Sequence, residues 1–229
     1  MLSSYAELDA DGLRICPVCR RIERPFNRAV AYGSYEGGLR ELIHLLKYNR
    51  VRPAAAVLGR MLSEAIADLE STFEHPAMFD QTIAVIPVPL YKTKLRQRGF
   101  NQAELIARAA LKQLPVAARF QLVSGVLLRT RDTESQIGLT GHQRRENLRG
   151  AFAVPCATQI TGREVLLVDD VYTTGTTASE CARVLLRAGA SQVWVATVAR
   201  TLKLASNYVE FPDDAGAEEH ERILTGRES

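Results

Sequence analysis

Long hydrophobic runs are absent from this chain of 229 residues. The longest apolar stretch, IAVIPVPL at residues 83–90, is far shorter than the ~18 residues that a membrane-spanning helix needs. The first residues, MLSSYAELDADG, contain acids where a secretory signal carries bases and an apolar stretch. A hydrophobic content of 46% and a charged content of 24% exclude the fibrous and disordered classes. We therefore predict a globular cytoplasmic protein without membrane insertion.

Cysteine is scarce as well: the chain has four, and only Cys16 and Cys19 form a CxxC pair. A structural zinc site needs four ligands, which usually come from two such pairs. Cys181 lies in a helical pattern typical of a small core residue, and Cys156 follows a proline. A disulfide framework is not expected at this size and in this compartment. Zinc binding by Cys16 and Cys19 alone stays open.

A Walker A loop, GxxxxGK[ST], is also missing, which argues against a nucleoside triphosphatase, and there is no GxGxxG motif.

Charged residues are present but unevenly distributed along the chain. Residues 209–229 hold seven acids and two bases, which leaves 27 bases and 19 acids in residues 1–208. A basic body with an acidic tail is compatible with a phosphate-rich ligand, small or polymeric, and equally with a solvated charged surface.

The hydrophobic pattern predicts strands that alternate with helices. Residues 165–199 read as strand, turn, helix and strand, a βαβ unit that implies a parallel sheet with a right-handed crossover. We expect an appendage at residues 1–28, an α/β domain at residues 29–208 and an acidic tail at residues 209–229. The expected strands lie at residues 29–35, 82–88, 122–128, 151–154, 165–168 and 192–199, and the expected helices at residues 39–47, 53–69, 100–114, 140–148 and 178–190.

The segment VLLVDDVYTTGTT, residues 165–177, concentrates polar groups at one end of a strand. Open α/β sheets bind ligands at the carboxyl ends of their strands. The unpaired amides at the start of the following helix attract an anion, and glycine allows close approach of the backbone. This predicts a monophosphate site formed by four hydroxyls and one glycine, those of Thr173, Thr174, Gly175, Thr176 and Thr177.

Asp169 and Asp170 precede this loop, where two carboxylates would repel a phosphate. They suit vicinal hydroxyls or a divalent cation on the same ligand. A phosphate at one end and a diol close by describe a ribose 5-phosphate. In the competing interpretation an aspartate caps a helix and the threonines fill a turn, which accounts for single residues better than for the ordered set.

A basic loop follows the strand at residues 82–88. It carries Lys92, Lys94, Arg96 and Arg98 before Gly99, a candidate hinge. Such a loop could close over a departing pyrophosphate and exclude water, since positive charge stabilises that leaving group. For each of these bases a solvated surface role is an equal alternative.

The chain resembles a known family at several of these points. VLLVDDVYTTGTT resembles the phosphoribosyl pyrophosphate (PRPP) motif of type I phosphoribosyltransferases. IPVPL at residues 86–90, RQRGFNQAELIA at residues 96–107 and the spaced Gln136, Arg144, Arg145 and Asn147 resemble the ComF family, whose members carry that transferase domain.

The resemblance covers residues 29–202 and implies a type I phosphoribosyltransferase-like parallel sheet flanked by helices. ComF proteins often begin with a zinc ribbon of two cysteine pairs, so the appendage with Cys16 and Cys19 resembles a remnant of it. By the same resemblance, Asp169 and Asp170 hold the ribose hydroxyls, and Mg²⁺ bridges ribose and pyrophosphate. The resemblance also implies 5′-phosphate binding by Thr173 to Thr177, a turn from Pro89 to Lys92 that faces the pyrophosphate, and a hood or acceptor side with Gln136, Arg144 and Asn147. From the residues themselves, Lys92, Arg96 and Arg98 are the candidates for pyrophosphate binding. Lys47 at its helix end is either a further residue of the hood side or a surface lysine that complements the helix dipole.

Two functions are compatible with this resemblance. The first is an enzyme that transfers phosphoribosyl from PRPP to an unidentified acceptor and releases pyrophosphate. The second is a non-catalytic module for DNA uptake (competence) that senses PRPP or binds single-stranded DNA or a helicase. Single-strand binders stack bases on aromatic side chains, and aromatics are only 7% here, with Tyr91 and Phe100 alone in the basic loop. This favours the enzyme.

Overall fold

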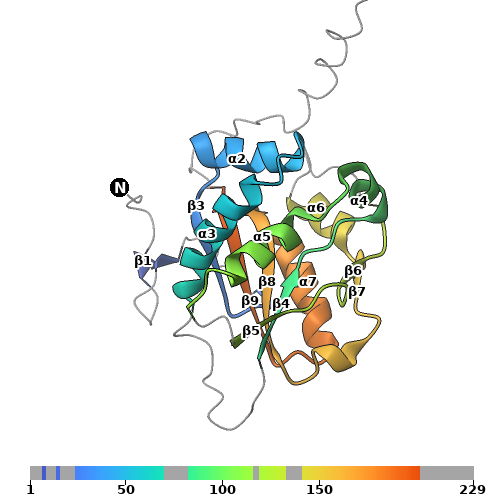
Figure 1. Ribbon diagram of the computed structural model, residues 1–229. Coiled ribbons are helices and arrows are strands. Elements are labelled where there is room, and N and C mark those ends of the chain that lie inside the picture. The colour runs from blue at the N-terminus through green and yellow to red at the C-terminus, as the bar shows by residue number, and fades with distance from the viewer. Residues whose placement is uncertain are drawn as a thin grey trace, which may run out of the picture.

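The computed structural model describes residues 7–8, 14–15, 24–69, 82–115, 119–132 and 141–201. Its centre is a five-stranded sheet in the order β3-β9-β8-β4-β5, in which every neighbouring pair is parallel (Figure 1). The prediction of an α/β protein with a parallel sheet flanked by helices is confirmed. The strands of this sheet are β3 (Arg28–Ser34), β4 (Ile83–Pro87), β5 (Phe120–Leu122), β8 (Glu164–Tyr172) and β9 (Gln192–Arg200).

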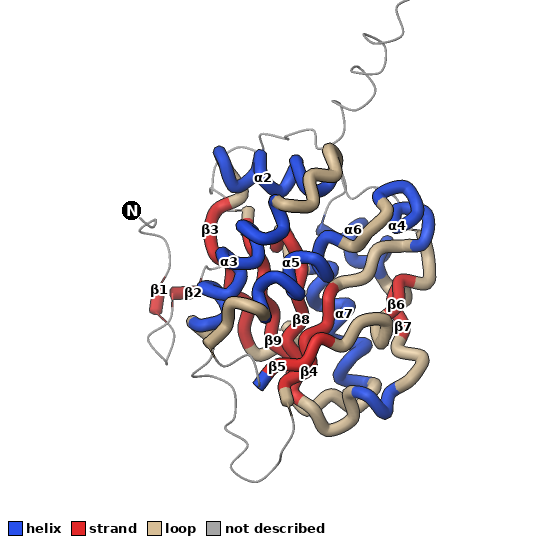
Figure 2. Tube along the Cα trace, viewed as in Figure 1, coloured by secondary structure: helices blue, strands red, loops and turns tan. Residues whose placement is uncertain are grey.

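Helices cover both faces of the sheet, as the helix and strand colouring of Figure 2 shows. One face packs against α2 (Gly37–Lys47), α3 (Ala54–Ala67) and α5 (Gln102–Leu111). The opposite face packs against α7 (Thr176–Arg187) together with the segment that contains β6, α6 and β7. The smaller elements are α4 (Lys92–Arg98), β6 (Leu128–Arg129), α6 (Gly141–Leu148), β7 (Phe152–Ala153), a 3₁₀ turn at Ala157–Gln159 and the strand pair β1 (Glu7–Leu8) and β2 (Arg14–Ile15).

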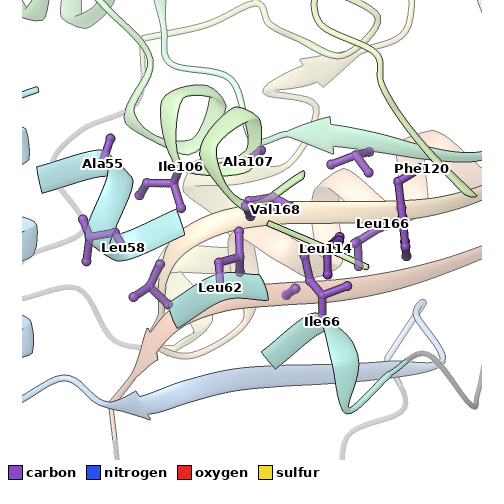
Figure 3. Close-up of a cluster of buried hydrophobic side chains, with 14 of the residues drawn as sticks. Ala55, Leu58, Leu62, Ile66, Ile106, Ala107, Leu114, Phe120, Leu166 and Val168 are labelled. Atoms are coloured by element: carbon purple, nitrogen blue, oxygen red, sulfur yellow. The ribbon is translucent and has the colours of Figure 1, made fainter. Parts of the chain in front are cut away.

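The buried strands explain this layering. All five residues of β4 are buried, as expected for a central strand with a helical layer on each side. Figure 3 shows one of the two resulting cores, in which Leu58 and Leu62 of α3 meet Ile106 of α5 and Leu166 of β8. The helices contribute one apolar stripe each, because their buried residues recur every three or four positions.

Three expectations about single elements were wrong. The strand predicted at residues 122–128 is two strands, because the chain turns at Gly125, whose φ of 81° suits glycine. The basic segment after β4 is the helix α4, which ends at Gly99 with a left-handed φ of 80°. The strand predicted at residues 165–168 continues to Tyr172 as β8, so both aspartates of the motif lie within a strand.

Only a short part of the N-terminal segment can be placed against the sheet. Residues 24–28 already contact the body, since the Asn27 amide donates to the Val193 carbonyl at 2.8 Å and Phe26 packs on the core beside α7. Cys16, Cys19 and the acidic tail at residues 209–229 lie outside the described residues. Among the helices that are described, none is both long and apolar enough to cross a bilayer.

Candidate functional site

The polar motif lies at the carboxyl edge of the sheet, where β8 passes into α7. Because all five strands are parallel, their carboxyl ends meet at this edge. A concavity there is lined by Asp169 of β8, by Thr173 and Gly175 after it, by Thr177 in the first turn of α7, and by Thr197 of β9. We call residues 173–177 the hydroxyl loop. The structure thus brings Asp169 to the hydroxyl loop, whereas the sequence analysis expected both motif aspartates there.

The hydroxyl loop is held by its own threonines and by a glycine. Gly175 is the N-cap of α7 and has a φ of 76°, a conformation that an L-amino acid with a side chain rarely adopts. The hydroxyls of Thr174 and Thr176 lie 2.8 Å apart, and the Thr176 amide donates to the Thr174 hydroxyl at 3.4 Å. The start of α7 carries no acidic residue in its first turn, so the positive end of its dipole is not neutralised locally. This arrangement suits an oxyanion.

The two aspartates of the motif have different surroundings. Neighbouring residues of a strand point to opposite faces of a sheet. Asp169 lines the concavity with the hydroxyl loop, and its Oδ1 accepts a hydrogen bond from the Asp170 amide at 2.9 Å. Asp170 is 4% exposed and lies against α2, where the Lys47 Nζ is 2.9 Å from its Oδ2. The predicted acid pair is therefore adjacent in sequence but divided between two faces.

Charge and burial shift the pKa of two groups at this point. Burial raises the pKa of the Asp169 carboxyl well above its ordinary range, and the charge of Asp170 raises it further. For Lys47, burial alone lowers the pKa, but the charge and the hydrogen bond of Asp170 outweigh it and the net pKa is raised. Lys47, predicted to reach the site from the end of its helix, is thus a firmly charged partner of Asp170.

Three contributors to this region escaped the sequence reasoning. Arg24 donates hydrogen bonds to the hydroxyl of Tyr172 and to the carbonyl of Thr174, the latter at 3.3 Å. Thr197 lies opposite Asp169 in the register of β8 and β9. Burial lowers the pKa of Arg129 of β6, and the nearby carboxyl group of Asp169 opposes that shift. Contacts between such distant positions leave no local signal in the sequence.

The bases predicted to bind pyrophosphate lie on the exposed helix α4. Lys92 and Arg96 are exposed, and Arg98 contacts the Gln102 side chain, with its guanidinium 5.8 Å from the ring centre of Tyr48. The Arg50 Nη2 donates to the Gln97 carbonyl at 2.6 Å, which joins α4 to the turn that follows α2. This surface adjoins Lys47, because the turn begins one residue after it.

The α5 part of the motif RQRGFNQAELIA has a structural explanation. Asn101 is the N-cap of α5, and its Oδ1 accepts a hydrogen bond from the Ala103 amide at 3.0 Å. Its Nδ2 donates to the Val88 carbonyl at 2.9 Å. One side chain therefore fixes the start of α5 to the carboxyl end of β4, next to the site.

The remaining predicted residues contribute little to this geometry. Gln136 lies outside the described residues, and Arg144 is placed only by the backbone of α6. The Asn147 carbonyl, also on α6, accepts a hydrogen bond from Arg131 at 3.4 Å. Their assignment to the hood or acceptor side remains a prediction.

Metal ligands other than the acid pair are not assembled in the described part of the chain. No cluster of three or more histidine, cysteine or acidic side chains that could hold a metal ion occurs among the described residues. Cys156 is exposed, whereas Cys181 is buried in α7. Zinc binding by Cys16 and Cys19 stays a prediction, since both lie outside the described residues.

Comparisons with known proteins agree with the motif. Residues 100–216 match the family described as phosphoribosyl transferase domain. The chain is 35% identical over 187 residues to a DNA utilization protein of Escherichia coli O157:H7, covering 82% of this chain and 78% of that protein. It is 32% identical over 186 residues to competence protein F of Haemophilus influenzae, covering 81% and 78%. A mutant hypoxanthine phosphoribosyltransferase from Trypanosoma cruzi, complexed with the product IMP, aligns with 77% of this chain and 93% of its own at 13% identity and a TM-score of 0.38.

Proposed function

Because the chain belongs to the ComF family, whose members carry a phosphoribosyl transferase domain, we propose that it binds PRPP at the carboxyl edge of its sheet. The observation that carries this proposal is the shared concavity of Asp169 and the hydroxyl loop at the start of α7. The loop from Thr173 to Thr177 receives the 5′-phosphate, because its amides and hydroxyls donate and the helix dipole favours an anion. The Asp169 carboxyl group, which lines the same concavity, accepts hydrogen bonds from the ribose hydroxyls.

The carboxyl group of Asp169 also suits a magnesium ion that accompanies PRPP. Magnesium takes oxygen ligands and is commonly held by one or two carboxylates together with phosphates of the substrate. Asp169 would hold it beside the hydroxyl loop, whereas Asp170 lies on the opposite face of β8 and is paired with Lys47. When bound, the ion neutralises charge that develops on the departing pyrophosphate.

Transfer of the phosphoribosyl group breaks the bond between the anomeric carbon and pyrophosphate, which leaves with the electron pair, and forms a bond to the acceptor. The transition state separates a cation-like sugar from an anionic leaving group, so positive side chains near pyrophosphate lower the barrier. Lys92, Arg96 and Arg98 of α4 supply such charge. Their helix lies just after the carboxyl end of β4, and a shift about Gly99 would bring it over the site.

A titration of the full chain with PRPP in the presence of magnesium tests this proposal. We expect Asp169→Asn to weaken PRPP binding about tenfold or more, because the amide keeps the size of the side chain but cannot ionise to the carboxylate that ribose hydroxyls and magnesium need. Asp68→Asn is the matched control, since Asp68 is exposed and caps α3 at its C-terminal end, before β4 begins. Equal affinities of wild type and Asp169→Asn, or no PRPP binding by the wild type, would refute the site. Release of pyrophosphate with a panel of nucleobases then measures turnover.

The exposed basic surface supports a second candidate, a non-catalytic module that binds single-stranded DNA. It consists of α4 together with Arg50 and Arg52, and Tyr48 on it is 45% exposed. Proteins usually bind single-stranded DNA through exposed lysine and arginine side chains that lie beside an aromatic ring. An oligonucleotide titration at two salt concentrations separates the candidates, because phosphate contacts make DNA binding weaken steeply as salt rises. DNA binding that Asp169→Asn leaves intact, without PRPP binding, would favour this module.

A further inference from the structure

A cation from a distant part of the chain lies on the hydroxyl loop. Arg24 precedes β3, yet its Nη1 donates to the Tyr172 hydroxyl and to the Thr174 carbonyl. Its guanidinium carbon is 5.5 Å from the ring centre of Tyr172 and 5.8 Å from that of Phe26. Arg24 thus lies near two aromatic rings, and its guanidinium reaches the start of α7.

Gly175 shows how closely Arg24 approaches the loop. A Cβ atom at Gly175 would collide first with the Arg24 Nη1 and then with the Tyr172 hydroxyl. The guanidinium therefore fills the space directly over the N-cap of α7. A cation at this end of a helix is repelled by the dipole, so the placement is unfavourable unless an anion is shared between the two.

The hydroxyl loop also lacks a positive charge of its own to balance a phosphate. Residues 173–177 carry no charged side chain, and the nearby Asp169 supplies no positive charge. A guanidinium offers paired donors that match phosphate oxygens and remains charged at every relevant pH. Arg24 lies where it can supply the missing positive charge, beside Gly175 at the start of α7.

We propose that Arg24 is a ligand of the sugar phosphate bound by residues 173–177, an inference that rests on the proposed function. Its Nη1 donates to the Tyr172 hydroxyl and to the Thr174 carbonyl, and phosphate oxygens replace these acceptors on binding. Phosphate recognition then requires the segment before β3 as well as the motif on β8 and α7.

Titration of the full chain with ribose 5-phosphate, and with PRPP and magnesium, tests this assignment. We expect Arg24→Ala to weaken both ligands by about 10- to 100-fold, the loss of a charge-assisted hydrogen bond, and Arg24→Lys to fall between, because lysine keeps the charge but not the fork. The affinity of Arg24→Ala should also depend less steeply on salt. Arg187→Ala, which removes an exposed charge from the far end of α7, is the matched control, and thermal unfolding of each variant reports whether it folds.

The possible outcomes distinguish a failure of the role of Arg24 from a failure of the proposed PRPP binding. Wild-type binding that Arg24→Ala leaves within twofold would overturn the role of Arg24 and leave the PRPP site intact. Tighter binding by a folded Arg24→Ala would show that Arg24 blocks the loop instead, which also overturns the assignment. A wild type that binds neither ribose 5-phosphate nor PRPP would remove both.

Discussion

Replacement of Lys47 by methionine is expected to lower the free energy of unfolding by about 3 kcal/mol, because it leaves the buried Asp170 without its counter-charge. The figure lies at the lower end of the range for broken buried pairs, since the Lys47 side chain is 19% exposed and water screens part of the interaction. Methionine keeps the length and apolar stem of lysine, so lost packing contributes little. Urea unfolding of wild type and Lys47→Met measures the difference.

The double variant Lys47→Met/Asp170→Asn distinguishes the charge effect from a packing effect. We expect it to recover much of the loss, because the neutral amide no longer needs a cation. Lys112→Met is the control: Lys112 is exposed after α5, and its replacement should change stability by no more than about 0.5 kcal/mol. A single variant as stable as the wild type would contradict the prediction.

The pH dependence of this contribution follows from the raised pKa of Lys47. A lysine whose pKa is higher in the folded than in the unfolded protein stabilises fully at pH values below the unfolded pKa of 10.5. The contribution declines only as pH rises from there through the folded-state value. The difference between wild type and Lys47→Met should therefore be constant across the neutral range and shrink in strong alkali.

Gly59→Ala is the second substitution with a large expected effect, and its sign is unusual. Alanine in place of glycine inside a helix normally stabilises by up to about 1 kcal/mol. At Gly59 of α3, however, the new Cβ would lie 2.5 Å from the Ala109 Cβ and 2.9 Å from the backbone carbon of Ala109 on α5. Since α3 and α5 must then separate, we expect a loss of about 2 kcal/mol in the free energy of unfolding.

Gly38→Ala in α2 is the matched control for Gly59→Ala. Nothing lies within 4 Å of the Cβ position at Gly38, so the ordinary gain from helix propensity should appear there. Ala109→Gly combined with Gly59→Ala should recover part of the loss, because it removes the contact between the two Cβ atoms but not the contact with the backbone. A stabilising Gly59→Ala would show that the two helices can separate freely.

Local sequence patterns predicted most of the secondary structure and the place of the site. Apolar periodicity located α2, α3, α5 and α7 to within a few residues, because each helix buries one face. It did not predict α4, whose residues are all polar or exposed and carry no apolar stripe. The strand predicted at residues 122–128 was wrong because its hydrophobic residues are buried in a turn, where Val126 and Leu127 are 2% exposed.

The sequence by itself determined the order of strand, acid pair, hydroxyl loop and helix in residues 165–177, because these groups are neighbours along the chain. Tertiary structure alone decided that Asp169 faces the loop and Asp170 faces Lys47, since the layers on each side of β8 come from other parts of the sequence. It also brought Arg24 to Tyr172, which is 148 positions away. The physical reason is that a parallel sheet places strands side by side that are remote in sequence. Which charged residues become partners therefore depends on the order of the strands and not on the spacing of the residues along the chain.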